Sequence, residues 1–131
     1  MRTYFIYNNL KVNTFLLQDQ PFPGFEILTW DHESSIMGTL WDLGLDAGYT
    51  PIGMTKVQGQ LWVAEDQTKV PELEEYMGVK SGLMEPMKVK VEVSTEQFHH
   101  ETVEAIVYRL AKIRDIYTIV PDGRWTIKRG N

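Results

Sequence analysis

The sequence contains no cysteine among its 131 residues. This absence excludes disulfides, cysteine-ligated zinc, iron–sulfur clusters and any thiol nucleophile. Long apolar runs are missing as well, because no stretch approaches the roughly 20 residues that a membrane-spanning helix needs. The first residues carry no sustained apolar segment of the kind found in secretory signals. We therefore expect a cytoplasmic protein with no membrane partner.

Basic side chains are scarce. The chain has 13 lysines and arginines against 18 acidic residues, which gives a formal net charge of −5. Only residues 101–131 carry more basic than acidic side chains. Binding to duplex nucleic acid requires a basic face that displaces counterions from the phosphates. The charge distribution therefore disfavours a duplex nucleic-acid partner.

The length and the content of apolar residues are those of one ordinary globular domain. Hydrophobic residues make up 43% of the chain and charged residues 24%, and 131 residues bury enough surface for a core without cross-links. We expect a single domain over residues 1–131. Four tryptophans are the unusual feature, and each predicts either a core anchor or the wall of a site.

Apolar periodicity predicts an α+β domain. Alternating or continuous apolar residues indicate strands, whereas apolar residues at helical spacing, with Pro71 near the start and Gly78 at the end, indicate a helix. The breakers Gly48, Pro51 and Gly53 predict a loop over 45–53. The expected strands are 4–7, 36–43, 55–63, 87–93 and 103–110, and the expected helices are 12–16 and 68–77. This order predicts a mixed or closed, barrel-like sheet with a few short helices.

Five short segments, in order along the chain, resemble motifs of the gamma-glutamylcyclotransferase-like family. They are FIYNNL at 5–10, GTLWDLG at 38–44, VQGQLW at 57–62, LEEYMG at 73–78 and PDGRW at 121–125. The resemblance implies a small α+β fold around a barrel-like sheet with a pocket at its mouth. It also implies an intramolecular reaction, in which the α-amine of a γ-glutamyl group attacks its own side-chain carbonyl and expels the attached amine as 5-oxoproline forms.

The resemblance assigns candidate binding residues to this pocket. Asn8 stands where the family has glycine, and an asparagine tolerates the backbone geometry of a loop that holds an anion through its N–H groups. The segment 38–51 resembles the loop at the pocket mouth. The ligand-binding residues that follow are Tyr7, Asn8, Asn9, Leu10, Trp41, Tyr49 and Met77.

The acid–base position of the motif is altered. The reaction needs one carboxylate to move a proton, and the catalytic glutamate of the family falls on Met77, which has no titratable proton. The nearby acids Glu74 and Glu75 are the remaining catalytic candidates, although rotation along a helix points them away from the direction of Met77. Counting back from the strand at 87–93, two further polar positions of the family fall on Met84 and Pro86.

These residues favour a member of the fold that has lost cyclotransferase activity and binds a small polar or anionic molecule in the inherited pocket. One alternative is an active cyclotransferase that uses Glu74 or Glu75. Another is a protein-interaction or inhibitor module with no ligand. We expect no cofactor and no metal, since adjacent histidines such as His99 and His100 point to opposite sides of an extended segment.

Overall fold

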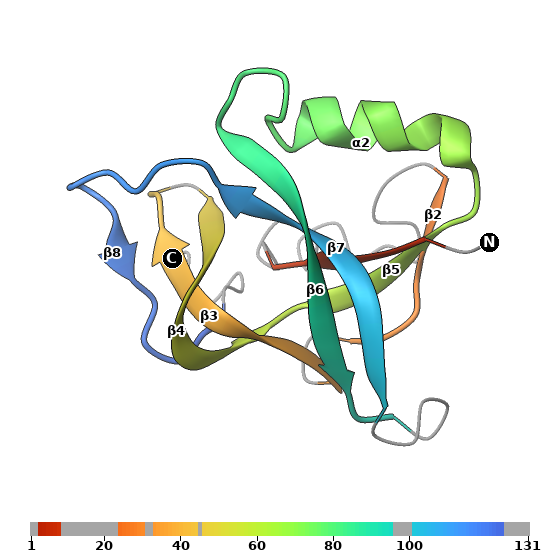
Figure 1. Cartoon of the computed structure of the whole chain (residues 1–131), viewed down its shortest axis with the longest axis horizontal. Coiled ribbons are helices and arrows are strands. Elements are labelled where there is room, and N and C mark those ends of the chain that lie inside the picture. Colours follow the sequence, from red (N-terminus) through yellow and green to blue (C-terminus); the bar gives the residue numbers. More distant parts are fainter. Residues whose placement is uncertain (1–2, 9–23, 31–32, 45, 96–100, 125–131) are drawn as a thin grey trace.

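The computed structural model describes residues 3–8, 24–30, 33–44, 46–95 and 101–124. This part of the chain is rich in strands and has one short α-helix (Figure 1). The elements are β1 (Tyr4–Tyr7), β2 (Phe25–Ile27), β3 (Ser34–Asp42), β4 (Ala47–Gln58), β5 (Gln60–Ala64), the 3₁₀ turn η2 (Gln67–Lys69), α2 (Val70–Tyr76), β6 (Met84–Val93), β7 (Thr102–Leu110) and β8 (Thr118–Ile119). No helix in these ranges has the length and apolar content needed to cross a bilayer.

The strands form one mixed sheet, in the order β2-β5-β1-β7-β4-β3-β6, with β8 paired to β3. Strand β7 is parallel to β1 and β4, and the other pairings are antiparallel. Because β6 also pairs with β7, the pairings β7–β4, β4–β3, β3–β6 and β6–β7 close a ring. The α+β class and the mixed sheet expected from the sequence are confirmed.

Alternation along β7 divides the interior into two apolar clusters. Ala105 and Val107 pack in one cluster with residues of β3, β4 and β6. Tyr108 and Leu110 point the opposite way, as successive residues of a strand must, into a second cluster of aromatic side chains. Leu73, which is fully buried, joins this second cluster and attaches α2 to it.

The loop expected over 45–53 is wrong for most of its length, because residues from Ala47 onward belong to the 12-residue strand β4. The breakers Pro51 and Gly53 lie where the register between β3 and β4 shifts, after Gly38. An irregularity of this kind places extra residues on one strand and bends it without ending it. Proline and glycine mark this irregularity, and the strand continues through it.

The single strand expected over 55–63 is two strands, β4 and β5, separated at Gly59. The Gly59 N–H donates to the Ser34 carbonyl (3.1 Å), outside the ladder. A Cβ at this position would lie 2.7 Å from the Asn8 amide nitrogen and from the Tyr7 carbonyl oxygen. Close approach of the chain after β1 therefore requires glycine at this corner.

The expected helix over 68–77 is confirmed as η2 followed by α2. Its first turn is capped by Asp66, whose Oδ1 accepts from the Thr68 N–H (3.0 Å). Gly78, at φ +85°, ends the helix in the left-handed conformation as expected. The helix expected over 12–16 lies outside the described residues. The expected strands 4–7, 36–43, 87–93 and 103–110 are present, the last three with shifted ends.

Candidate functional site

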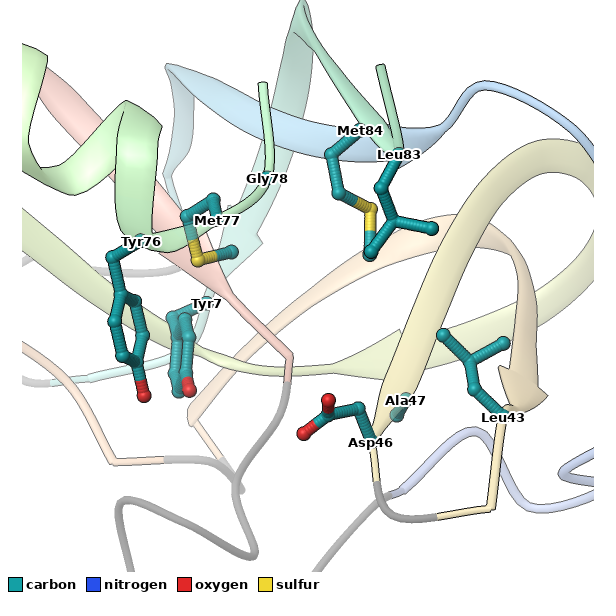
Figure 2. Close-up of a pocket in the computed structure, with 9 residues that line it drawn as sticks. All are labelled: Tyr7, Leu43, Asp46, Ala47, Tyr76, Met77, Gly78, Leu83 and Met84. Atoms are coloured by element: carbon teal, nitrogen blue, oxygen red, sulfur yellow. The ribbon is translucent and has the colours of Figure 1, made fainter. Parts of the chain in front are cut away.

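A cavity of about 210 Å³ lies beside the end of α2. Figure 2 shows its walls, which come from the end of β1, the turn between β3 and β4, and the chain that leads from α2 to β6. The lining residues are Tyr7, Leu43, Asp46, Ala47, Tyr76, Met77, Gly78, Leu83 and Met84.

The last residue of β1, Tyr7, forms the base of one wall. It pairs with Gln60 across the antiparallel ladder, and its ring stacks on Trp62 with 4.5 Å between centroids. These contacts bury the tyrosine, and only 5% of it is exposed. The ladder and the stacked indole therefore hold Tyr7 in one orientation.

The Tyr7 hydroxyl is hydrogen-bonded to the Tyr76 hydroxyl, and the two rings lie next to each other in Figure 2. Burial raises the pKa of Tyr7 far above its usual range, and Tyr76 and the Asp46 carboxylate shift it in the same direction. The Tyr7 hydroxyl therefore stays protonated near neutral pH. It can donate or accept a hydrogen bond, but it cannot act as a base.

Asp46 approaches the cavity from the turn before β4. The Leu43 N–H donates to the Asp46 carbonyl oxygen (2.9 Å), and the Gly44 N–H donates to the Asp42 carboxylate (2.8 Å). These bonds hold both ends of the turn. The side chain of Asp46 is exposed and points toward Tyr7 (Figure 2).

The opposite wall is apolar and is built by the reversal after α2. The Met77 N–H closes the last helical turn on the Leu73 carbonyl (2.8 Å). The Gly78 carbonyl then accepts from the N–H groups of Leu83 (3.0 Å) and Met84 (3.2 Å). This reversal brings Leu83 and Met84 to the same cavity as Met77 (Figure 2).

Two of the predicted binding residues, Tyr7 and Met77, line the cavity. Asn8 is buried directly after Tyr7, and its amide donates to the Gln58 carbonyl (3.0 Å). Asn9 and Leu10 lie outside the described residues. Met84, which the motif comparison placed at a polar position of the family, also lines the cavity.

Trp41 and Tyr49 are not among the lining residues. The Trp41 indole N–H donates to the Thr50 hydroxyl (2.9 Å), and the Tyr49 hydroxyl donates to the Met37 carbonyl. Tyr49 is 2% exposed and packs in the first apolar cluster. Both side chains thus tie β3 to β4, and their role in binding stays a prediction.

The catalytic candidates Glu74 and Glu75 also lie outside the cavity lining. Glu75 is exposed and Glu74 is half-buried. Burial, and to a lesser degree the charge of Glu74, raises the pKa of the buried Tyr108 hydroxyl. A catalytic role for either glutamate therefore stays a prediction.

Sequence reasoning missed Asp46, although it lies between Gly44 and Tyr49, inside the segment that carries the family resemblance. An acidic residue in a turn is usually a solvated surface residue, so its type alone gave no signal. The described ranges contain no group of three or more histidine and acidic side chains suited to a metal ion. His99 and His100 lie outside those ranges.

A second hollow, of about 190 Å³, is basic. Its lining includes Lys112, Arg114 and Tyr117, and it shares Leu83 with the first cavity. Neither Lys112 nor Arg114 takes part in an ion pair within the described part of the chain. The two hollows therefore carry opposite charge on either side of a shared leucine.

The fold defined by this sheet and helix is the gamma-glutamylcyclotransferase-like fold. A solved structure named gamma-glutamyl cyclotransferase matches 91% of this chain and 70% of its own, with a TM-score of 0.63 and 14% identity. An AIG2-like protein from Mus musculus matches at 13% identity and a TM-score of 0.63, over 87% of this chain and 80% of the mouse chain. The Escherichia coli protein ytfP matches at 19% identity and a TM-score of 0.60, over 98% and 99% of the two chains.

No sequence model of a protein family matches this chain, and no curated protein matches it. The likeness to the solved structures therefore rests on shape, at identities below one in five residues. It confirms the fold that the five sequence motifs predicted. Activity has to be argued from the side chains of this chain.

Proposed function

We propose that the protein binds a small organic molecule in the cavity beside α2 and does not form 5-oxoproline from γ-glutamyl amines. The observation that carries the proposal is Met77. Its side chain lines the cavity, and the motif resemblance places the catalytic glutamate of the family at this position. A thioether can neither accept nor return the proton that the cyclisation moves.

The rest of the wall supports binding over catalysis. Met84 occupies another position where the resemblance expects a polar side chain, and it is 7% exposed. Methionine adapts its flexible, polarizable side chain to irregular apolar ligands. Tyr7 stays protonated and so cannot replace the missing base. Met77 and Met84 thus stand where the family resemblance expects polar side chains, and both still line the cavity.

A second candidate function follows from Asp46. Its carboxylate lines the same cavity as Met77, so a cyclotransferase that has moved its base from α2 to the turn before β4 would use Asp46. In that case the carboxylate would take the proton of the substrate ammonium and return it to the leaving amine. This candidate differs from one based on Glu74 or Glu75 because those side chains do not line the cavity.

One assay separates the two functions. The purified protein is incubated with a panel of γ-glutamyl amines, and 5-oxoproline is measured against a heat-inactivated control. We expect no product above that control. Product that disappears in Asp46→Asn would instead establish the second candidate, and product that disappears only in Glu74→Gln or Glu75→Gln would establish the helix glutamates.

Binding is tested by filling the cavity. A tryptophan in place of Met77 occupies space that a ligand needs, so Met77→Trp is expected to abolish any rise in melting temperature caused by metabolite fractions or small organic probes. The matched control is Met54→Trp, since Met54 is 84% exposed on β4 and does not line the cavity. Ligand effects that survive in Met77→Trp would contradict the proposal and favour a module without a ligand in this cavity.

A further inference from the structure

The cavity has one charged group on an otherwise neutral lining. Among its nine lining side chains, Asp46 alone carries a charge at neutral pH, and none of the nine is basic. Tyr7 and Tyr76 add two hydroxyls that lie beside each other, and the Asp46 carboxylate points toward them from the turn before β4 (Figure 2). The polar end of the cavity is therefore negative, and it offers oxygen atoms that accept hydrogen bonds.

The electric field of Asp46 reaches the interior of this site. Its negative charge contributes to the raised pKa of Tyr7, after burial and the effects of Tyr76. A carboxylate ligand in the same cavity would meet that field with no lysine or arginine on the lining to offset it. A cation would meet a carboxylate and two tyrosine hydroxyls.

The remaining lining is apolar. Met77, Leu83 and Met84 face the cavity from the side of α2, and Leu43 and Ala47 face it from the turn before β4 (Figure 2). Such a lining excludes a fully polar ion, because burying an uncompensated polar group is costly. It suits an apolar body attached to the charged head.

We propose that the ligand of this cavity is an organic ammonium ion with a small apolar body. Its N–H groups face the Asp46 carboxylate and the Tyr7–Tyr76 hydroxyl pair, and its carbon skeleton packs between Met77, Leu83 and Met84. This inference rests on the proposed binding function and specifies the class of ligand. It differs from the anionic ligand that the loop after β1 suggested in the sequence.

Two basic side chains line the other hollow. Lys112 and Arg114 line it together with Ser81 and Tyr117, and neither lines the cavity that contains Asp46. Leu83 is the residue that both hollows share. The preference for a cation is thus a property of the Asp46 cavity alone, whatever the second hollow binds.

The test compares three probes that share a branched carbon skeleton and differ in charge. Isopentylamine is cationic at neutral pH, isopentyl alcohol is neutral and isovalerate is anionic. Binding of each probe to the full chain is measured by isothermal titration calorimetry. We expect the amine to bind about fivefold more tightly than the alcohol. The difference is no larger because the Asp46 carboxylate is exposed, so solvent limits the free energy that its attraction to the ammonium group contributes to binding. Isovalerate should bind more weakly than the alcohol.

The variant Asp46→Asn removes the charge and keeps the shape. We expect it to lower the affinity for isopentylamine to that for isopentyl alcohol. The matched control is Asp115→Asn, an exposed position that does not line the cavity, which should keep the preference for the amine. Urea unfolding without ligand checks that Asp46→Asn is folded, and the probe series on the unaltered protein tests the charge preference independently of any variant.

The outcomes separate the inference from the function on which it rests. Alcohol or isovalerate binding as tight as that of the amine, together with loss of binding in Met77→Trp, would overturn the ammonium class and keep the binding cavity. A preference for the amine that persists in Asp46→Asn would also overturn the inference. Binding of all three probes that is unaffected by Met77→Trp, or no binding of any probe, would overturn the proposed function as well.

Discussion

The hydroxyl of Tyr7, at the end of β1, is hydrogen-bonded to the hydroxyl of Tyr76, at the end of α2. Tyr7 is 5% exposed and Tyr76 is 56% exposed. This bond joins a strand of the sheet to a helix of only seven residues. A helix of that length is not stable alone in water, so its position depends on tertiary contacts such as this one.

The two ends of this hydrogen bond should respond differently to removal. Tyr76→Phe leaves the buried Tyr7 hydroxyl without its partner, which costs about 1–3 kcal/mol. Tyr7→Phe leaves only the exposed Tyr76 hydroxyl, which water can satisfy, so its cost should be smaller. Urea unfolding measures both, and the double variant should show a coupling energy of about 1 kcal/mol. Additive effects, or a larger cost for Tyr7→Phe, would show that the bond does not stabilise the native state.

Stability should fall at alkaline pH because of the buried tyrosines. Burial raises the pKa of Tyr7, Tyr49 and Tyr108 above the ordinary value near 10. Above pH ~10 the unfolded chain loses these protons while the native state keeps them, so the free energy of unfolding decreases as the pH rises through that range. Each such tyrosine contributes a slope of up to about 1.4 kcal/mol per pH unit.

The check on this dependence is a set of urea unfolding curves between neutral and alkaline pH. Above pH ~10, Tyr7→Phe should reduce the slope of the unfolding free energy against pH by the contribution of about one proton. Below the ordinary tyrosine pKa, this slope should be the same as in the unaltered protein. The control variant is Tyr4→Phe. Tyr4 lies at the other end of the same strand and is less buried than Tyr7. An alkaline slope unaffected by Tyr7→Phe would contradict the prediction.

Much of the fold is readable from the sequence because it depends on local patterns. Apolar alternation identified β6 and β7, and Pro71 and Gly78 bracketed α2. Strand β4 was missed in part because Pro51 and Gly53 are loop signals in isolation. Only the pairing with β3, whose register shifts after Gly38, places them in a strand. Register between distant segments is not encoded in the local pattern.

The cavity was partly readable for a similar reason. Tyr7 and Met77 follow from motifs whose spacing survives in the chain, and both line it. Asp46 and Leu83 did not follow, because a turn and a helix reversal carry them there. The bond from the Leu43 N–H to the Asp46 carbonyl and the bond from the Leu83 N–H to the Gly78 carbonyl are features of the folded chain. Sequence patterns therefore identified the fold and one residue in each of two cavity walls, Tyr7 and Met77. They did not identify Asp46, the charged residue of the lining.

Leu73 should be the main apolar anchor of α2. It is fully buried, and replacing a buried leucine with alanine costs about 2–5 kcal/mol. Leu73→Ala is therefore expected to lower the midpoint of urea unfolding and to loosen the helix end that carries Tyr76 and Met77. Glu75→Ala, at an exposed position of the same helix, should change stability by less than about 0.5 kcal/mol. Equal effects of the two variants would show that α2 is not held through this leucine.

Alanine variants at Gly78 and Gly82 distinguish the effect of backbone strain from the effect of a changed cavity shape. Both have positive φ, +85° and +80°, so alanine at either position is strained and should cost about 1 kcal/mol. A Cβ at Gly82 meets nothing within 4 Å, whereas one at Gly78 meets the Leu83 Cβ at 3.2 Å. Gly78→Ala should therefore cost more than Gly82→Ala in urea unfolding. It should also weaken isopentylamine binding, because Leu83 must move, while Gly82→Ala leaves that affinity unchanged. Equal affinities in the two variants would mean that the position of Leu83 does not shape the bound state.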